Sequence, residues 1–387
     1  RVLLAPTLSE ILSLHGHEYM AIGAGTSGNA YLQNPTAEKF GGATIHPEFT
    51  LPRSLNQQLA NRFGAWPDES RPNTQRTAHC LRILTEYMLS ERNPTVSMIW
   101  SSEPDKSQHD SPVGSSLSHA AISEADGLFG DLMDWLRRTG REGDTDVMVA
   151  SDHGYSTISQ TIDVEGLVGR AGFLLGGDSG NVVVASNGGS ALFYTQPGDH
   201  DTAQRLAFWL MAQPWCGSLT VGESIGEIPG TLPASVLGNQ GLRCPEITMS
   251  FRWDSISNGS GYPGTVYSTG GAAGNGQHGS MSKHEMNNVL YAFGPSFKQN
   301  LRVDTPSGNV DLAPTVLRIL GITGGPHMDG RVLEEALAGG PDPASVAIST
   351  KVHQAEHRLV SKSYRQRIKI SSVGETNYID EGNAELS

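Results

Sequence analysis

The segment Val147-Met148-Val149-Ala150-Ser151-Asp152-His153-Gly154 places a polar cluster directly after a short apolar run. A Val-rich run of four residues is typical of a buried strand and suits the middle of a parallel sheet that is covered on both faces. Ligands of open α/β sheets bind beyond the carboxyl ends of the strands. We therefore expect Asp152 and His153 to lie where ligands bind, with Gly154 letting the backbone turn. A carboxylate beside an imidazole suits Zn²⁺ or Mn²⁺, although this motif alone also fits a polar turn.

Composition sets the outer limits of the interpretation. A length of 387 residues fits one large α/β domain or two smaller ones. The net charge of −13, from 40 acidic and 27 basic residues, argues against a protein that binds the nucleic-acid backbone, and we expect no binding of nucleic-acid duplexes. The three cysteines, Cys80, Cys216 and Cys244, lack metal-ligand spacing and allow at most one disulfide. No apolar run reaches the roughly 20 residues of a membrane span.

A second polar cluster follows the predicted strand at residues 95–100. It reads Glu103-Pro104-Asp105-Lys106-Ser107-Gln108-His109. In a helical turn Asp105 and His109, four residues apart, share one face and can converge on one ion. Glu103 is either a carboxylate that supports the ligands or a solvent-facing side chain. A solvated turn is the alternative interpretation of the whole segment.

The order of these segments indicates a βαβ unit. The second cluster is followed by an amphipathic helix at residues 117–136, which delivers the chain to the strand ahead of Asp152. Two neighbouring strands then both end in potential metal ligands. A third candidate, His278, lies between glycines in the segment 274–280, where a flexible backbone can bring an imidazole into a crowded site. An ordinary surface loop is the alternative there.

Other segments carry local signals for helices, strands or loops. Thr7-Leu8-Ser9-Glu10 resembles a capping box, and Asp311 is expected to be the N-terminal acid of a helix. His353 and His357 are four apart in a predicted short helix, which is either a zinc face or a surface helix. The predicted elements are helices at 8–14, 73–92, 310–321 and within 352–363, strands at 19–23 and 288–295, an irregular stretch at 34–70, and an edge hairpin at 364–378 that turns near Gly374-Glu375.

Taken together, the motifs resemble the type I phosphodiesterase/nucleotide pyrophosphatase family of the alkaline phosphatase superfamily. The resemblance runs from about Ala5 to about Leu337 and keeps the order of the family's three metal motifs. The matching segments are Glu-Pro-Asp-x-x-x-His at 103–109, Ser-Asp-His-Gly at 151–154, Gly-x-His-Gly at 276–279, Gly-Pro-x-Phe at 294–297 and Asn-Val-Asp-Leu-Ala-Pro-Thr at 309–315.

The resemblance implies an alkaline-phosphatase-like α/β core, with a largely parallel sheet and helices on both faces. It implies a hydrolase with two divalent metal ions, usually zinc. One ion would be held by Asp105, His109 and His278, and the other by Asp152 and His153. Residues 1–338 would form the hydrolase domain, with 187–263 as an insertion that shapes the substrate pocket, and 339–387 would be a C-terminal extension packed on the core.

In this family an Asp after the first strand and a nucleophilic Thr or Ser also belong to the second ion, and both precede the segment that corresponds to Thr7-Leu8-Ser9-Glu10. Neither has a match here, so we expect the nucleophile upstream of residue 1 and an N-terminally incomplete fold. A catalytic zinc takes three protein ligands, and the second set reaches only two. Thr26, in a Gly-rich turn after the strand at 19–23, is the one conceivable substitute.

The resemblance favours a small-molecule phosphodiester, pyrophosphate or nucleotide substrate, and an extracytoplasmic or secreted location. Related superfamily members hydrolyse phosphomonoesters, phosphonates or sulfate esters. A non-catalytic remnant that binds metal is an alternative of another class. The aromatic residues in the middle of the chain are either core residues or a surface for stacking a base; they are Phe208, Trp209, Trp215, Phe251 and Trp253.

Overall fold

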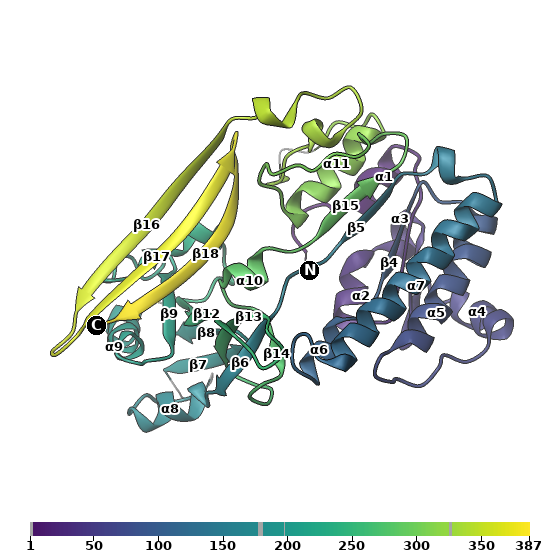
Figure 1. The fold of residues 1–387 in the computed structure, drawn as a ribbon. Helices are drawn as coiled ribbons and strands as arrows, with labels where there is room; N and C mark the ends of the chain where they lie inside the picture. The colour runs from purple at the N-terminus through teal and green to yellow at the C-terminus, as the bar shows by residue number, and fades with distance from the viewer. Residues whose placement is uncertain (1–2, 177–180, 197, 325–326) are drawn as a thin grey trace.

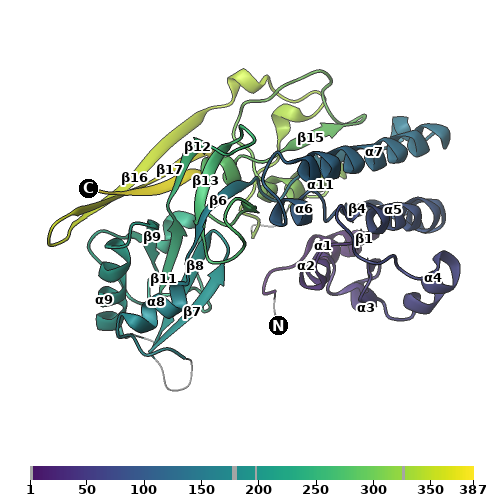
Figure 2. The ribbon, with the colours of Figure 1, turned by 60° about the horizontal axis from the view of Figure 1, so that its bottom comes forward.

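The computed structural model describes residues 3–176, 181–196, 198–324 and 327–387. Its first half is built on a four-stranded sheet of order β3-β2-β1-β4, in which β1 runs parallel to both β2 and β4. Figures 1 and 2 show the helices of this half on one side of the molecule and the sheets of the middle of the chain on the other. The strands are β1 (Tyr19–Gly23), β2 (Ala43–His46), β3 (Phe49–Leu51) and β4 (Val96–Trp100).

Helices cover both faces of this sheet, as predicted. Successive side chains of a strand point to opposite faces, so Tyr19 and Ala21 of β1 enter one core while Met20 and Ile22 enter another. The first core is closed by α1 (Leu8–Leu14) and α11 (Leu312–Ile319). The second is closed by α4 (Leu55–Phe63), α5 (Thr74–Ile83), the π-helical η1 (Leu84–Arg92) and α7 (Ser116–Arg138).

Two local predictions in this half have different outcomes. The capping box of α1 is present, because Thr7 Oγ1 accepts from the Glu10 amide and Glu10 accepts from the Thr7 amide. The expectation that residues 34–70 are irregular is wrong. They form α3 (Ala37–Phe40), β2, β3 and α4, since the prolines fall between these short elements. Thr26 is the N-cap of α2 (Ser27–Gln33), where its hydroxyl accepts from the Asn29 amide.

The strand β5 (Val147–Ala150) corrects the prediction of a buried strand in the middle of a parallel sheet. Among the described strands it pairs only with β15 (Leu290–Phe293), and this pairing is antiparallel. Its first three residues are partly buried and Ala150 is exposed. A run of small apolar residues shows that a strand is favoured, but partners from distant segments decide how many sides of it are covered.

The middle of the chain forms two further sheets, of order β12-β13-β6-β14 and β10-β9-β11-β8-β7. Their strands are β6 (Ser156–Thr161), β7 (Val182–Asn187), β8 (Ser190–Thr195), β9 (Cys216–Val221), β10 (Leu232–Pro233), β11 (Ile247–Phe251), β12 (Trp253–Ser257), β13 (Pro263–Ser268) and β14 (Gly276–Gln277). The helices α8 (Val164–Arg170) and α9 (His200–Met211) pack on the five-stranded sheet. Trp215, Phe251 and Trp253 are buried in this core, which agrees with the core alternative for the aromatic residues.

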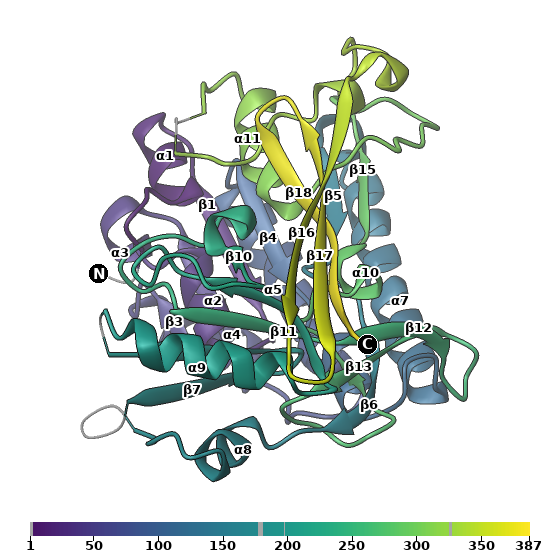
Figure 3. The ribbon, with the colours of Figure 1, turned by 90° about the vertical axis from the view of Figure 1, so that its left-hand side faces the viewer.

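The C-terminal residues form a long three-stranded antiparallel sheet (Figure 3). Its strands are β16 (Ile348–Arg358), β17 (Ser363–Val373) and β18 (Thr376–Leu386), and β17 and β18 lie against β9. The hairpin turning at Gly374-Glu375 is confirmed, with Gly374 at φ 59°. The predicted helix within 352–363 is wrong.

An antiparallel ladder with β17 extends over the whole of β16, and these pairings determine its conformation more strongly than helical spacing does. Four residues of a strand span about 13 Å, so the backbones carrying His353 and His357 are too far apart for the zinc-face alternative, and the surface-helix alternative is excluded with the helix.

Two further short helical elements lie near the candidate site residues. They are α10 (Lys283–Met286) and η4 (Asn309–Asp311), which leads directly into α11. All three cysteines are free thiols, and Cys80 is buried within α5. Within the described ranges, no helix combines the length and the apolar character required to cross a bilayer.

Candidate metal centre

The first two ligand pairs follow strands β4 and β5. After β4 the chain enters α6 (Asp105–His109), and the helical spacing places Asp105 Oδ1 3.5 Å from His109 Nε2. After β5 the chain turns through Asp152 and His153, whose Oδ1 and Nε2 atoms are 3.4 Å apart. Figure 1 shows α6 at the junction between the helical half and the middle sheets, beside β14.

Asp105 is the point on which the imidazoles converge. Its Oδ1 lies 3.8 Å from Nε2 of His153 and 3.7 Å from Nε2 of His278. The rings of His153 and His278 are stacked, with centroids 3.5 Å apart. Asp105, His153 and His278 form a group whose potential ligand atoms lie within 4.8 Å of one another. The structure therefore brings all five predicted residues together, with His109 touching Asp105 and Asp152 touching His153.

The donor set fits a divalent transition metal. Imidazole nitrogen and carboxylate oxygen are ordinary ligands of Zn²⁺. His153 directs Nδ1 at the carbonyl oxygen of Gly154, 3.0 Å away, which leaves Nε2 free to act as a ligand when Nδ1 carries the proton. Burial and the neighbouring His153 lower the pKa of His278 to about 4, so its imidazole is neutral at neutral pH. Neutral imidazoles and a carboxylate are the protonation states that metal binding requires.

Glu103 hydrogen-bonds the backbone at the start of α6. Its side chain is 7 % exposed, which rules out the solvent-facing alternative. The carboxylate accepts hydrogen bonds from the backbone amides of Ser107 (3.0 Å) and Asn73 (2.9 Å). It thus satisfies a free amide in the first turn of α6 and complements the positive end of the helix dipole. The contact is with a backbone amide of α6 and with that of Asn73, the N-cap of α5, and not with an imidazole.

The glycine-rich segment brings His278 to the other ligands. The Asn275 side chain donates to the His109 carbonyl at 3.0 Å, and the Gly276 amide donates to the Ser111 carbonyl at 3.2 Å. A Cβ on Gly276 would lie 2.8 Å from the ring of Tyr155. Gly279 has a φ of 99°, a conformation that side chains rarely adopt. Glycine is therefore required at two points of this loop.

Tyr155 belongs to the site and was missed by sequence reasoning. Its hydroxyl has two possible acceptors on Asp105, which are the carboxylate and, at 3.0 Å, the backbone carbonyl oxygen. Its ring contacts the rings of His109, His153 and His278, each at a centroid distance of 5.4 Å. Burial and the charge of Asp105 raise the pKa of Tyr155, which keeps the phenol protonated as a donor. The sequence signal that could have identified Tyr155 is its position directly after Gly154.

Two asparagines that sequence reasoning also missed hold the turn that carries Asp152. The side chain of Asn288 donates to the Ser151 carbonyl at 2.8 Å. Asn309 donates to the carbonyls of Ser151 (3.1 Å) and Asp152 (3.2 Å). Both asparagines flank elements that the sequence predicts, but nothing local to them indicates this contact.

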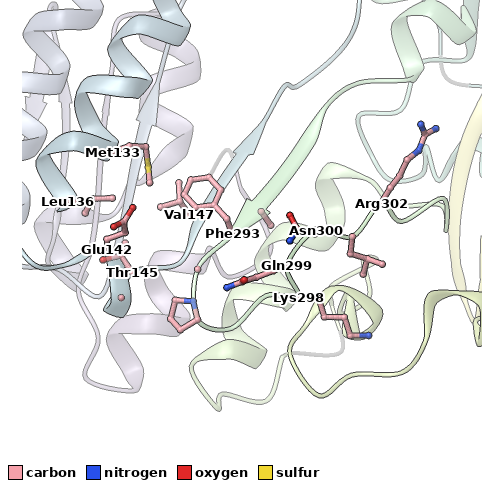
Figure 4. Close-up of a pocket in the computed structure, with 15 residues that line it drawn as sticks. Met133, Leu136, Glu142, Thr145, Val147, Phe293, Lys298, Gln299, Asn300 and Arg302 are labelled. Atoms are coloured by element: carbon pink, nitrogen blue, oxygen red, sulfur yellow. The ribbon is translucent and has the colours of Figure 1, made fainter.

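A cavity of about 830 Å³ lies elsewhere, between α7 and the β5–β15 pair (Figure 4). It is lined by Met133 and Leu136 of α7, Val147 at the start of β5, and Phe293 at the end of β15. The five candidate ligands, which we call the ligand cluster, gather beyond the opposite end of β5, where Asp152 and His153 follow the strand. The cavity is therefore not part of the candidate metal centre.

Comparison with solved structures shows which fold this is. Murine ectonucleotide pyrophosphatase/phosphodiesterase 5 matches with a TM-score of 0.57 and 17% identity, over 86% of this chain and 75% of that one. An inactive threonine-to-alanine variant of the same murine protein, in complex with AMP, matches with a TM-score of 0.56 and 18% identity over the same shares. The wild-type alkaline phosphatase PafA matches with a TM-score of 0.52 and 15% identity, over 68% of this chain and 53% of that one.

At these identities the likeness establishes the alkaline-phosphatase-like α/β fold alone. No curated protein sequence matches the chain. The model of the type I phosphodiesterase / nucleotide pyrophosphatase family matches residues 17–212, which are half of the chain and include Asp105, His109, Asp152 and His153 but not His278. The chain therefore belongs to the type I phosphodiesterase / nucleotide pyrophosphatase family.

Proposed function

We propose that this protein is a metal-dependent hydrolase of phosphodiester or pyrophosphate bonds. The observation that carries the proposal is the convergence of three imidazole Nε2 atoms, those of His109, His153 and His278, within 3.8 Å of Asp105 Oδ1. Family membership supplies the reaction class. Such a donor set without a metal would concentrate polar groups in one place at a cost in desolvation, and a bound ion offsets that cost.

In this proposal two divalent ions, most simply zinc, share the cluster. Asp105, His109 and His278 hold one, and Asp152 and His153 contribute to the other. When bound, such ions polarise a phosphoryl oxygen and lower the pKa of a nucleophilic hydroxyl. The closeness of His153 to Asp105 supports two adjacent sites, since the two ligand sets meet at that contact.

The chain's own residues prepare this site before any substrate arrives. Glu103 fixes the first turn of α6, and the Tyr155 hydroxyl orients the carboxylate of Asp105. The turn that carries Asp152 is held through its backbone carbonyls by Asn309. Ligands fixed by neighbouring hydrogen bonds lose little conformational entropy on binding, which favours affinity and a defined geometry.

We further propose that a Thr or Ser outside these 387 residues supplies the nucleophile, as the family pattern suggests. In the described part of the chain, no aliphatic hydroxyl hydrogen-bonds any of the five candidate ligands, and the hydroxyl at Asp105 is the phenol of Tyr155. A nucleotide is the favoured substrate, supported by the AMP complex of the murine relative. The names of the ectonucleotide relatives support an extracytoplasmic location for this protein.

The test measures metal content by plasma emission together with the turnover of three substrates. They are bis(p-nitrophenyl) phosphate, p-nitrophenyl phosphate and p-nitrophenyl sulfate. The test uses this chain and a chain that also carries the upstream segment required by this proposal. We expect two zinc ions and diester turnover in the extended protein. Turnover by the 387 residues alone would refute the proposed origin of the nucleophile. Faster monoester or sulfate turnover would overturn the substrate class, and the absence of metal from both proteins would overturn the site.

A further inference from the structure

The short helix α10 lies between the two segments that carry His153 and His278. On one side, the backbone carbonyl of Glu285 accepts a hydrogen bond of 2.7 Å from the amide of Gly154. On the other side, the Glu285 carboxylate accepts from Ser280, at 2.7 Å from the amide and 2.7 Å from the hydroxyl. One residue therefore joins the position directly after His153 to the position two residues after His278.

The approach of these segments is close. A Cβ on Gly154 would lie 2.3 Å from the backbone oxygen of His284, so only glycine allows the turn to come this near α10. The Ser280 hydroxyl, which donates to Glu285, also accepts from the Ser282 amide at 3.1 Å. Ser282 is the N-cap of α10. These contacts connect the His278 loop through α10 to the His153 turn. We call this set of contacts, centred on Glu285, the bracket.

A four-residue helix has almost no stability of its own, because nucleation costs more than one turn of hydrogen bonds returns. The position of α10 therefore depends on its anchors. Glu285 is 2 % exposed, and burial raises the pKa of its carboxyl group. Burying a carboxyl group among neutral partners costs more free energy than burying an apolar side chain. Its two oxygens offset part of this cost by accepting from the Ser280 amide and hydroxyl.

We propose that Glu285 is a positioning residue that sets the spacing between the imidazoles of His153 and His278. The consequence for metal affinity rests on the proposed function, whereas the bracket itself does not. When the carboxylate is removed, the Ser280 amide loses its buried acceptor and α10 loses its anchor, so the two imidazoles are no longer held at a fixed separation.

The test compares Glu285→Ala and Glu285→Gln with Glu335→Ala as a matched control. Glu335 is also 2 % exposed and is anchored by Arg331 at 2.6 Å. In the described part of the chain it has no hydrogen bond or ion pair with the five candidate ligands. The first measurement is hydrogen exchange of the metal-free chain. We expect Glu285→Ala to accelerate exchange in both 151–156 and 278–282, while the control leaves both segments unchanged. Acceleration confined to 278–282 would overturn the bracket.

The second measurement is Co²⁺ affinity and the visible spectrum of the Co²⁺-loaded full chain. Loss of residues that orient ligands typically lowers metal affinity about 10- to 100-fold, and we expect this and an altered spectrum for Glu285→Ala. Glu285→Gln should restore both, because its amide can accept from the Ser280 amide and donate to the Ser280 hydroxyl. Wild-type affinity in a folded Glu285→Ala variant would refute the inference.

The two measurements separate the possible failures. A wild-type chain that takes no Co²⁺ would overturn the metal proposal, and the exchange measurement would still decide on the bracket. If Glu285→Ala does not fold, Ser280→Ala replaces it. That variant removes the hydroxyl contacts with the Glu285 carboxylate and the Ser282 amide but keeps the bond from the Ser280 amide to Glu285. We expect faster exchange in the same two segments. Unchanged exchange in Ser280→Ala would then count against the inference.

Discussion

Tyr378 ties the C-terminal sheet to the region of the candidate site, and its hydroxyl can be removed alone. This hydroxyl donates to Asp311 Oδ2 at 2.9 Å and accepts from Arg331 Nε at 3.0 Å. Asp311, which is completely buried, was predicted as a helix N-terminal acid, and it lies at the junction of η4 and α11. Asn309, two residues earlier, holds the turn of Asp152. Tyr378→Phe therefore tests how strongly β18 is held to the junction of η4 and α11.

The expected loss follows from the contacts that remain. Asp311 keeps the amides of Gly308 (2.9 Å) and Arg331 (2.8 Å), and the Arg331 guanidinium keeps Glu335. The lost donor to a fully buried carboxylate dominates, since a hydrogen bond to a charged group contributes about 1.5–3 kcal/mol. We expect Tyr378→Phe to lower the free energy of unfolding by about that amount.

The assay is urea-induced unfolding of wild type, Tyr378→Phe and the control Tyr291→Phe. Tyr291 is 65% exposed, so its change should stay within about 0.5 kcal/mol. Combining Tyr378→Phe with Asp311→Asn should cost less than the sum of the single changes, because both remove the same hydrogen bond. A loss for Tyr378→Phe no larger than that for Tyr291→Phe would refute the reasoning.

The remaining predictions concern metal content and acid stability. His278→Ala should lower the bound zinc measured by plasma emission, whereas His353→Ala, on a C-terminal strand, should leave it unchanged. Glu103→Ala should weaken zinc affinity about 10- to 100-fold in competition with a chelator, because the first turn of α6 loses its acceptor. The hydrogen bond from Lys106 holds the pKa of Glu69 at about 2, below the ordinary 4.5. This stabilisation is complete above pH 4.5 and is lost as the pH falls toward 2, so Glu69→Gln should lower the melting temperature at pH 6 and have progressively less effect below pH 4.5.

Outside residues 34–70, most elements of the first half could be predicted because their signals are local. A capping box, a helical apolar stripe and a β-branched run each act within a few residues. The C-terminal hairpin was found for the same reason, since Gly374 marks a two-residue turn between alternating segments. The strand at 348–358 was missed because its pairing with β17, and not its own spacing, determines its conformation.

The candidate site shows the same difference between local signals and contacts of distant segments. The sequence by itself determined which residues can act as ligands and that Asp105 and His109 share one helical face, because residue type and helix geometry need no distant partner. Only the tertiary structure decided that β5 pairs with β15 and with no other described strand, that His278 reaches Asp105, and that Tyr155 donates to Asp105 while Glu285 accepts from Ser280. These contacts join segments far apart in the chain, and their geometry follows from how separate sheets and loops pack, which local patterns do not encode.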